Sequence, residues 1–201
     1  ILVYDFGGGT FDVSLITASE NQFIELGKAG NLWLGGDDID NVMIQFVKTQ
    51  VAQQEELTDI EQWLDQMQPI QRMRFLADLK IAVEQAKIAL NQTDSVRITP
   101  PTPLLNDLQM PVFIDVELTR QQFEELLTPI VERTIPICHD AIRYSEYAVE
   151  DVDVVLLVGG SSQIPLVQQK VRDTFGADKV VVHPRPMYAV AEGAAIMAAG
   201  L

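Results

Sequence analysis

DFGGGTFD, residues 5–12, lies between two apolar runs of the chain, residues 1–4 and 13–16. Apolar runs separated by glycines predict a strand, a tight turn and a second strand. Glycine has no Cβ, so the backbone N–H groups of such a turn can point together at an anion. The carboxylates of Asp5 and Asp12 flank the turn and would repel a phosphate unless a divalent cation lay between them. The stretch therefore predicts one wall of a Mg-nucleotide site, with a Gly-rich hairpin turn and two solvated acids as the alternative.

The bulk composition sets limits on the class of protein. A chain of 201 residues is long enough for one domain of two lobes or for two small domains. Its 47% hydrophobic and 21% charged residues are ordinary for a soluble globular protein. The net charge of −15 argues against nucleic acid and anionic membrane surfaces as partners. A nucleotide remains compatible with this charge, because backbone amides and a metal ion supply a local positive field.

Cysteine usage and the start of the chain suggest where the protein works. Cys138 is the single cysteine, so no internal disulfide can form, and we expect a reducing, cytoplasmic setting with Cys138 as a small buried hydrophobe. No apolar run reaches the length of a membrane span. The chain opens on Ile1 without a start Met or a charged leader, so we expect a piece of a longer protein.

Hydrophobic patterning in the first half predicts a strand meander followed by helices. Strands are expected at residues 1–6, 11–17 and 23–28. A second glycine turn, residues 34–38, leads into a helix with Asp37 or Asp38 as its N-cap. Further helices are expected at about residues 56–66 and 71–91, the second of them preceded by Pro69.

The second half alternates strands and helices. Strands are expected at residues 95–99, 110–116, 152–158 and 179–182. A helix begins after Thr119, with Gln122 at the capping-box position, and continues to about residue 144 with interruptions at its prolines. Helices are also expected at residues 164–175 and 189–199, the latter rich in small residues and able to pack closely. Ser161 and Ser162, after a glycine pair, are expected to act as N-caps.

Other conspicuous side chains have structural interpretations. Trp33 and Trp63 are expected to pack against their lobe rather than contact a ligand. His139 and His183 have no companions at metal-ligand spacing, so both are expected to be structural or solvent-facing.

Four blocks in order give a more specific indication than any single motif. They are DFGGGTFD (5–12), LGGDDID (34–40), EQAK (84–87) and LVGGSSQIP (157–165). In this order and spacing they resemble the second half of the nucleotide-binding domain of the seventy-kilodalton heat-shock chaperones of the DnaK type. The resemblance spans residues 1–201.

The resemblance implies an actin-like, ribonuclease H-like ATPase fold, of which this chain would be the second lobe. That lobe is α/β, with a mixed sheet and flanking helices plus an α+β insertion. Its base subdomain would be residues 1–36 and 128–201, and its inserted upper subdomain residues 37–127. The first phosphate loop and the catalytic lysine of the family belong to the first lobe, so the isolated lobe is expected to be inactive.

The resemblance also implies roles for individual residues toward ATP or ADP and Mg²⁺, with K⁺ as a further candidate. Asp5 and Thr10 would lie at the reacting phosphate, and Asp5 and Asp12 near the metal. The phosphates would be held by Gly7, Gly8, Gly9 and Thr10. Gly36 matches a glycine at the cleft, and the turn beneath the nucleoside matches Gly159, Gly160 and Ser161.

The helix predicted at residues 71–91 would supply the other side of the nucleoside site. Glu84, Lys87 and Asn91 are spaced i, i+3 and i+7, so they would share one helical face. The resemblance assigns this face to the ribose and adenine, whereas the residues alone would favour a solvated Glu–Lys pair.

Three positions depart from the family pattern. Ile88 and Gln163 stand where the family usually has arginines against the two faces of adenine, and Met187-Tyr188 replaces an acidic pair. Isoleucine cannot give the planar stacking of a guanidinium. We therefore hypothesise weaker or altered base recognition with the phosphate end intact.

The expected partners follow from the resemblance: a nucleotide, the first ATPase lobe, a peptide-binding domain, client peptides, and a co-chaperone and nucleotide-exchange factor. The complete protein would be a chaperone ATPase acting in protein folding and the stress response. Two alternatives stay open. One is a non-hydrolysing binding or scaffold module, and the other is a different actin-like protein such as a sugar kinase or a filament former.

The hypothesis about the base predicts poor discrimination between nucleotides. In the complete protein, the affinities for ADP and GDP should differ little, because no arginine stacks on the base. Isothermal titration with each nucleotide measures this. Tight binding with a strong preference for adenine would contradict it.

Overall fold

The computed structural model of the chain describes residues 1–19 and 22–200, so positions 20, 21 and 201 of the predicted base subdomain lie outside the described residues. The chain divides into two compact units. Unit 1 comprises Ile1–Asp38 and Thr128–Leu201, and unit 2 comprises Ile39–Leu127.

Unit 1 is built on a mixed sheet with strand order β3-β2-β1-β8-β9. β1–β2 and β2–β3 are antiparallel, whereas β1–β8 and β8–β9 are parallel, so the predicted meander and mixed sheet are both confirmed. The strands are β1 (Leu2–Phe6), β2 (Phe11–Ser19), β3 (Gln22–Asn31), β8 (Val155–Val158) and β9 (Val180–Val182).

Alternation along β1 and β2 puts the aromatic side chains and most of the other large apolar ones on one buried face of the sheet. Tyr4, Phe6 and Phe11 are fully buried there, with ring centroids 4.7 to 6.3 Å apart in edge-to-face arrangements. The Tyr4 hydroxyl donates to Thr134 Oγ1 at 2.9 Å, and burial raises the pKa of Tyr4. This hydrogen bond satisfies the one polar group of the aromatic cluster, as a buried phenol requires.

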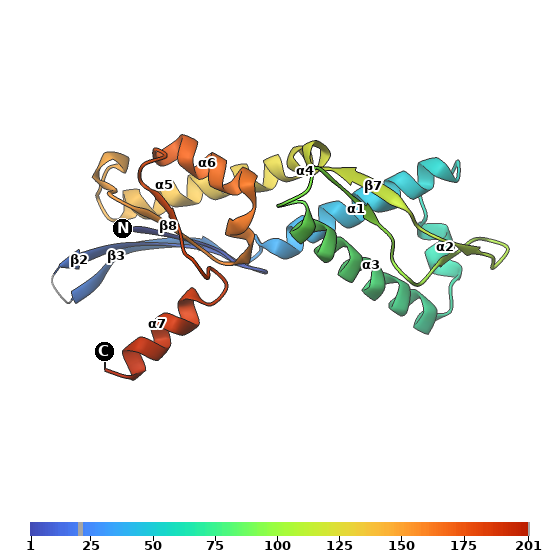
Figure 1. Cartoon of the computed structure of the whole chain (residues 1–201), viewed down its shortest axis with the longest axis horizontal. Helices are drawn as coiled ribbons and strands as arrows, with labels where there is room; N and C mark the ends of the chain where they lie inside the picture. Colours follow the sequence, from blue (N-terminus) through green and yellow to red (C-terminus); the bar gives the residue numbers. More distant parts are fainter. Residues whose placement is uncertain (20–21, 201) are drawn as a thin grey trace. The chain divides into compact units, whose positions relative to one another are not determined.

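Two helices lie along that apolar face, α5 (Thr134–Tyr144) and α6 (Pro165–Phe175) (Figure 1). Cys138 on α5 is fully buried, and burial raises the pKa of its thiol, so the prediction of a buried hydrophobe is confirmed. None of the residues of α7 (Ala189–Ala198) is buried, so the close packing that its small side chains allow stays a prediction.

Unit 2 combines helices with two small antiparallel sheets, β4–β7 and β5–β6. α3 packs against β4, and α2 packs against β5 (Figure 1). The core includes Ile39 and Met43 from α1 and Phe75 and Leu79 from α3. The elements are α1 (Gly36–Gln54), α2 (Glu61–Gln66), α3 (Pro69–Ala89), β4 (Ser95–Ile98), β5 (Leu104–Leu105), β6 (Pro111–Val112), β7 (Val116–Thr119) and α4 (Arg120–Glu132).

Several predicted boundaries were wrong. α1 begins at Gly36, so neither Asp37 nor Asp38 is its N-cap; Asp38 Oδ2 instead accepts the Gly35 N–H at 2.8 Å from inside the first turn. α2 begins five residues later than predicted, after a backbone at Glu56 with φ of 56°. Pro69 is the first residue of α3 rather than its predecessor, which suits a residue without an N–H.

Other differences concern the strands and the tryptophans. The strand predicted at 110–116 is split into β6 and β7, and β8 is shorter than expected. Trp63 is buried, but Trp33 is 82% exposed, so its predicted packing is wrong. The capping box is confirmed: Thr119 N–H donates to Gln122 Oε1 at 3.0 Å, and Gln122 N–H donates to Thr119 Oγ1 at 3.3 Å.

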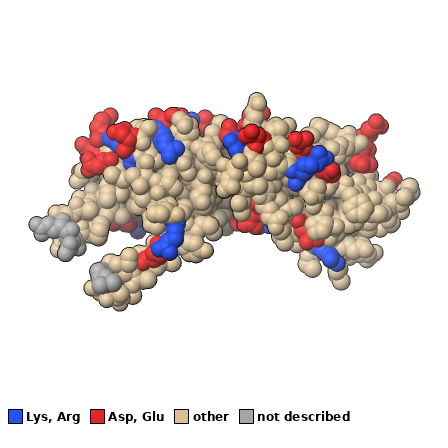
Figure 2. Space-filling view, in the orientation of Figure 1, with Lys and Arg blue, Asp and Glu red and all other residues tan. Residues whose placement is uncertain are grey.

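None of the helices in the described ranges is both long and apolar enough to cross a membrane. Acidic side chains are spread over the visible surface with basic ones between them, rather than gathered in one patch (Figure 2).

Candidate functional site

Three loops of unit 1 meet at the carbonyl oxygen of Gly7. This oxygen accepts the Gly36 N–H at 3.0 Å and the Ser161 hydroxyl at 3.0 Å. The next carbonyl, of Gly8, accepts the Asp37 N–H at 2.7 Å. The turn after β1, the start of α1 and the turn after β8 are therefore joined through backbone groups.

The loops approach so closely that side chains are excluded at two glycines. A Cβ on Gly35 would lie 2.6 Å from the Gly8 carbonyl oxygen. Gly159 has a φ of +82°, and a Cβ there would overlap the Phe6 carbonyl oxygen and lie 2.6 Å from Asp5 Oδ1. Both positions thus require glycine for space, and Gly159 also requires it for its backbone conformation.

The turn after β1 presents unused hydrogen-bond donors. Gly7 N–H closes the turn by donating to the Thr10 carbonyl at 3.0 Å. The N–H groups of Gly8, Gly9 and Thr10 donate to no backbone carbonyl among the residues that the structure describes, and Gly8 and Gly9 are exposed. Successive backbone N–H groups left free in a turn form a binding site for an anion.

Two carboxylates lie beside this turn. Asp5 and Asp12 are directly opposite one another in the β1–β2 register, on the face of the sheet away from α5. Burial, and then the charge of Asp12, raise the pKa of Asp5. Thr10 Oγ1 donates to Asp12 Oδ2 at 2.9 Å, and within residues 1–19 and 22–200 neither acid has an ion-pair partner. The pair would be stabilised by a cation.

A metal would need ligands from outside the protein here. The described part of the chain holds no group of three or more His, Cys, Asp or Glu side chains able to bind a metal ion. Mg²⁺ in nucleotide sites is commonly held by one or two carboxylates, with phosphate oxygens and water completing its shell. Asp5 and Asp12 fit that requirement.

The predicted nucleoside residues of unit 2 are organised differently from expectation. Lys87 Nζ lies 2.7 Å from Asp40 Oδ1, with side chains only 15% and 6% exposed, so Lys87 pairs with Asp40 rather than with the exposed Glu84. Sequence reasoning missed Asp40, although it ends the LGGDDID block. Ile88 is 61% exposed.

Asn91 lies beyond the last helical residue, Ala89, so the prediction that it shares a helical face with Glu84 and Lys87 is wrong. The α3 helix ends in a turn in which Asn91 N–H donates to the Ile88 carbonyl at 3.3 Å. Asn91 Oδ1 is buried and accepts no hydrogen bond from any described residue.

The turn after β8 is held by its serines. Ser162 Oγ donates to the Gly159 carbonyl at 2.7 Å, and Ser161 Oγ to Gly7. The N-cap of α6 is Ile164, so the prediction that these serines are N-caps is wrong. Gln163 is exposed, and Gly160 is half-buried.

Unit 1 thus brings together one group of predicted site residues, and unit 2 holds the others. The group in unit 1 consists of Asp5, Gly7, Gly8, Gly9, Thr10, Asp12, Gly36, Gly159, Gly160, Ser161 and Gln163. The group in unit 2 consists of Glu84, Lys87, Ile88 and Asn91.

Comparison with known proteins gives the relatives of the chain. A sequence model of the Hsp70 protein family matches residues 1–201. Chaperone protein DnaK 3 of Synechococcus sp. is 39% identical over 201 residues, covering 98% of this chain and 29% of that protein. Chaperone protein dnaK1 of Synechocystis sp. is 39% identical over 198 residues, covering 98% of this chain and 27% of that protein. The chain spans less than a third of the length of these relatives, and the resemblance seen in the four sequence blocks is confirmed.

The glycine requirement at the junction can be tested with one methyl group. Gly159→Ala should lower the free energy of unfolding, because a backbone at φ 82° and ψ 153° is essentially confined to glycine and costs a residue with a Cβ about 1–3 kcal/mol, and the overlap with Phe6 adds to this. Urea denaturation measures the change. Gly193→Ala is the matched control, since outside its own helix no described residue has an atom within 4 Å of a Cβ placed there. Equal stability of Gly159→Ala and the unmodified chain would contradict the close approach.

The facing carboxylates should make stability depend on pH. Asp12→Asn should raise the free energy of unfolding at neutral pH by about 0.2–1 kcal/mol, the size of a cross-strand pair. Because the folded pKa of Asp5 is raised, its ionisation opposes folding. This cost is absent below the ordinary Asp pKa of about 3.9 and develops as the pH rises through the raised value.

Urea denaturation at pH 7 and near pH 3 measures both effects. The gain from Asp12→Asn should shrink at the lower pH, whereas Asp107→Asn, at an exposed acid in the β5–β6 turn, should change little at either. A gain that is independent of pH would show that the two charges do not interact.

Proposed function

The chain belongs to the Hsp70 protein family, and from that premise we propose that it is the second lobe of the ATP-binding domain of a molecular chaperone. Unit 1 would be the base subdomain and unit 2 the inserted upper subdomain. The proposal rests on the turn after β1, where three N–H groups that donate to no backbone carbonyl of the described residues lie beside the carboxylates of Asp5 and Asp12.

At this turn the chain's own groups would bind the phosphates of ATP or ADP. The amides of Gly8, Gly9 and Thr10 would donate to phosphate oxygens, where backbone donors stabilise charge without reorganising. Asp5 and Asp12 would hold Mg²⁺ and its water shell, with K⁺ as a further candidate. Bound Mg²⁺ would offset negative charge on the phosphate oxygens. Its positive charge would also lower the raised pKa of Asp5 and leave that carboxylate ionised to orient a water.

Recognition of the nucleoside is assigned on the family resemblance. The residues proposed are Gly36, Glu84, Lys87, Ile88, Asn91, Gly159, Gly160, Ser161 and Gln163. The pairing of Lys87 with Asp40 supports a role toward neutral ligand groups, because the lysine charge is already balanced inside unit 2. Hydroxyl groups of a ribose have that chemistry, whereas a phosphate would compete with Asp40.

The complete protein, which we propose to be cytoplasmic, would hydrolyse Mg·ATP to control the binding of client peptides during protein folding. Its first lobe, its peptide-binding domain, a co-chaperone and a nucleotide-exchange factor would be the partners of this lobe. Hydrolysis would depend on positioning and charge stabilisation rather than on covalent chemistry.

Gly8→Ala tests the phosphate assignment. Apart from its two neighbours in the chain, no described residue has an atom within 4 Å of a Cβ placed at Gly8, so the methyl group should leave stability unchanged. It should nevertheless weaken Mg·ADP binding by the complete protein about tenfold or more, the effect of losing ~1.4 kcal/mol or more at the loop. Isothermal titration calorimetry measures the affinity, and Gly193→Ala in α7 is the control. Equal affinity of Gly8→Ala and the unmodified protein for Mg·ADP would contradict the assignment of the phosphates to this loop.

A non-hydrolysing scaffold is the second candidate, favoured by the exposed Ile88 where the family usually has an arginine. Single-turnover hydrolysis of Mg·ATP by the complete protein separates the two candidates. Slow hydrolysis accelerated by an extended apolar peptide would support the chaperone ATPase. Nucleotide binding without turnover would support the scaffold.

A further inference from the structure

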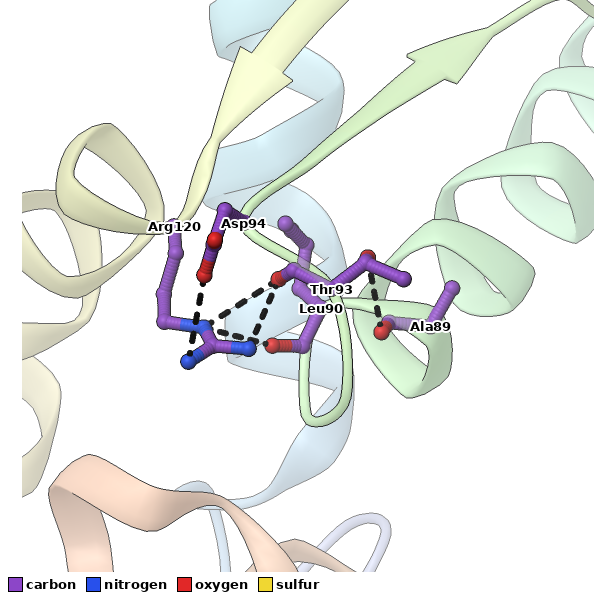
Figure 3. A network of polar contacts seen from close by, with 5 residues as sticks. All are labelled: Ala89, Leu90, Thr93, Asp94 and Arg120. Atoms are coloured by element: carbon purple, nitrogen blue, oxygen red, sulfur yellow. Dashed lines mark hydrogen bonds and ion pairs between the residues drawn. The ribbon is translucent and has the colours of Figure 1, made fainter.

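The turn that follows α3 is closed by an arginine from elsewhere in unit 2. Arg120 is the first residue of α4, and its guanidinium reaches the turn at residues 90–94 (Figure 3). Its Nε lies 3.1 Å from the Leu90 carbonyl oxygen and 3.2 Å from that of Thr93, and its Nη2 donates to the Thr93 carbonyl at 2.8 Å. One side chain thus binds both ends of the turn.

The local fold explains why the arginine reaches this place. β7 pairs with β4, and Arg120 N–H extends the pairing by donating to the Asp94 carbonyl at 2.8 Å. The capping box of Thr119 and Gln122 then fixes the first turn of α4, which carries Arg120. The side chain is therefore delivered by a strand end and a helix start that are both hydrogen-bonded.

The carbonyl contacts outweigh the ion pair in this network. Arg120 Nη1 lies 3.5 Å from Asp94 Oδ1, but the Asp94 side chain is 99% exposed, and such surface pairs contribute little. The carbonyls at the end of a helix lack partners within the helix and carry its partial negative charge, so a cationic donor is favoured there. The guanidinium also presents several donors in a rigid fork, which suits two carbonyls at once.

Asn91 lies inside the segment that Arg120 closes. Its Oδ1 is buried and has no hydrogen-bond donor among the described residues. A buried acceptor without a donor lowers the stability of the folded state, so it calls for an explanation. Elsewhere in the turn, Thr93 donates to the Ala89 carbonyl through both its N–H, at 3.1 Å, and its hydroxyl, at 3.0 Å. A donor from a bound ligand, such as a hydroxyl group, would satisfy Asn91 Oδ1.

We propose that Arg120 is a positioning residue for the ligand site of unit 2. By binding the Leu90 and Thr93 carbonyls it fixes the turn at residues 90–94, and it thereby presents Asn91 Oδ1 to a hydroxyl donor of the ligand. The identity of that ligand as a nucleotide rests on the proposed function. The ordering of the turn by Arg120 does not.

The first test measures hydrogen exchange of the complete protein without nucleotide. Arg120→Ala should raise exchange in the turn at residues 90–94 and leave the middle of α3 protected. Arg120→Lys should raise it less, because an ammonium can bind one carbonyl but lacks the fork. Arg97→Ala is the matched control, since Arg97 makes an exposed pair with Asp115 in the same unit. Unchanged exchange in the turn of Arg120→Ala would overturn the proposal.

The second test is a double-mutant cycle on Mg·ADP affinity. Arg120→Ala and Asn91→Ala should each weaken binding by about 10- to 100-fold, if the range found for residues that orient metal ligands applies to this turn. The double variant should bind as weakly as either single variant, because one acts through the other. Additive losses, or no loss from Arg120→Ala, would overturn the positioning role. Absence of Mg·ADP binding by the unmodified protein would instead refute the proposed function, and the exchange experiment would still decide whether Arg120 orders the turn.

Discussion

The carbonyl oxygen of Gly7 accepts hydrogen bonds from both the Gly36 amide and the Ser161 hydroxyl. These two bonds hold together segments that are far apart in the chain. The segment before α1 and the segment after β8 can both approach the turn after β1 only because each has a glycine there. At Gly35 and Gly159 there is no room for a side chain, so the backbones can come into direct contact. Because the Gly7 carbonyl is used in this way, the hairpin turn does not close on itself completely. Within the described residues, the N–H groups of Gly8, Gly9 and Thr10 donate to no backbone carbonyl.

A pair of like charges on the open face of the sheet indicates which kind of ligand this arrangement would bind. Asp5 and Asp12 face each other across two strands, and this raises the pKa of Asp5 beyond the effect of burial. Two carboxylates that face each other in this way reduce the stability of the fold. A cation bound between them would offset their repulsion. Free amides for an anion and paired acids for a cation, side by side, suit a metal-bound anion better than either ion alone. Membership of the Hsp70 family makes Mg·ATP or Mg·ADP the natural proposal.

Local patterns in the sequence predicted the strands and the position of the glycine turn. The alternation of Tyr4 and Phe6 with Asp5 defines which face is buried, and the capping box at Thr119 defines a helix start. What failed depends on contacts between distant residues. Asp40 was missed because its partner, Lys87, lies on another helix, and Asn91 was placed on a helix that ends two residues earlier. The serines after β8 fit an N-cap pattern, but the Gly7 and Gly159 carbonyls are their actual partners. Arg120 attracted no attention in the sequence, since its role arises from the meeting of β4, β7 and the end of α3.

In the proposed function, the free amides after β1 bind the phosphates of a nucleotide. The most direct measurement is an NMR titration of the complete protein, labelled with ¹⁵N-glycine, with Mg·ADP. The amide resonances of Gly8 and Gly9 should shift strongly on saturation, because their N–H groups would gain charged acceptors, whereas that of Gly193 in the exposed α7 should stay in place. Saturable binding of Mg·ADP that leaves Gly8 and Gly9 unshifted would contradict the account.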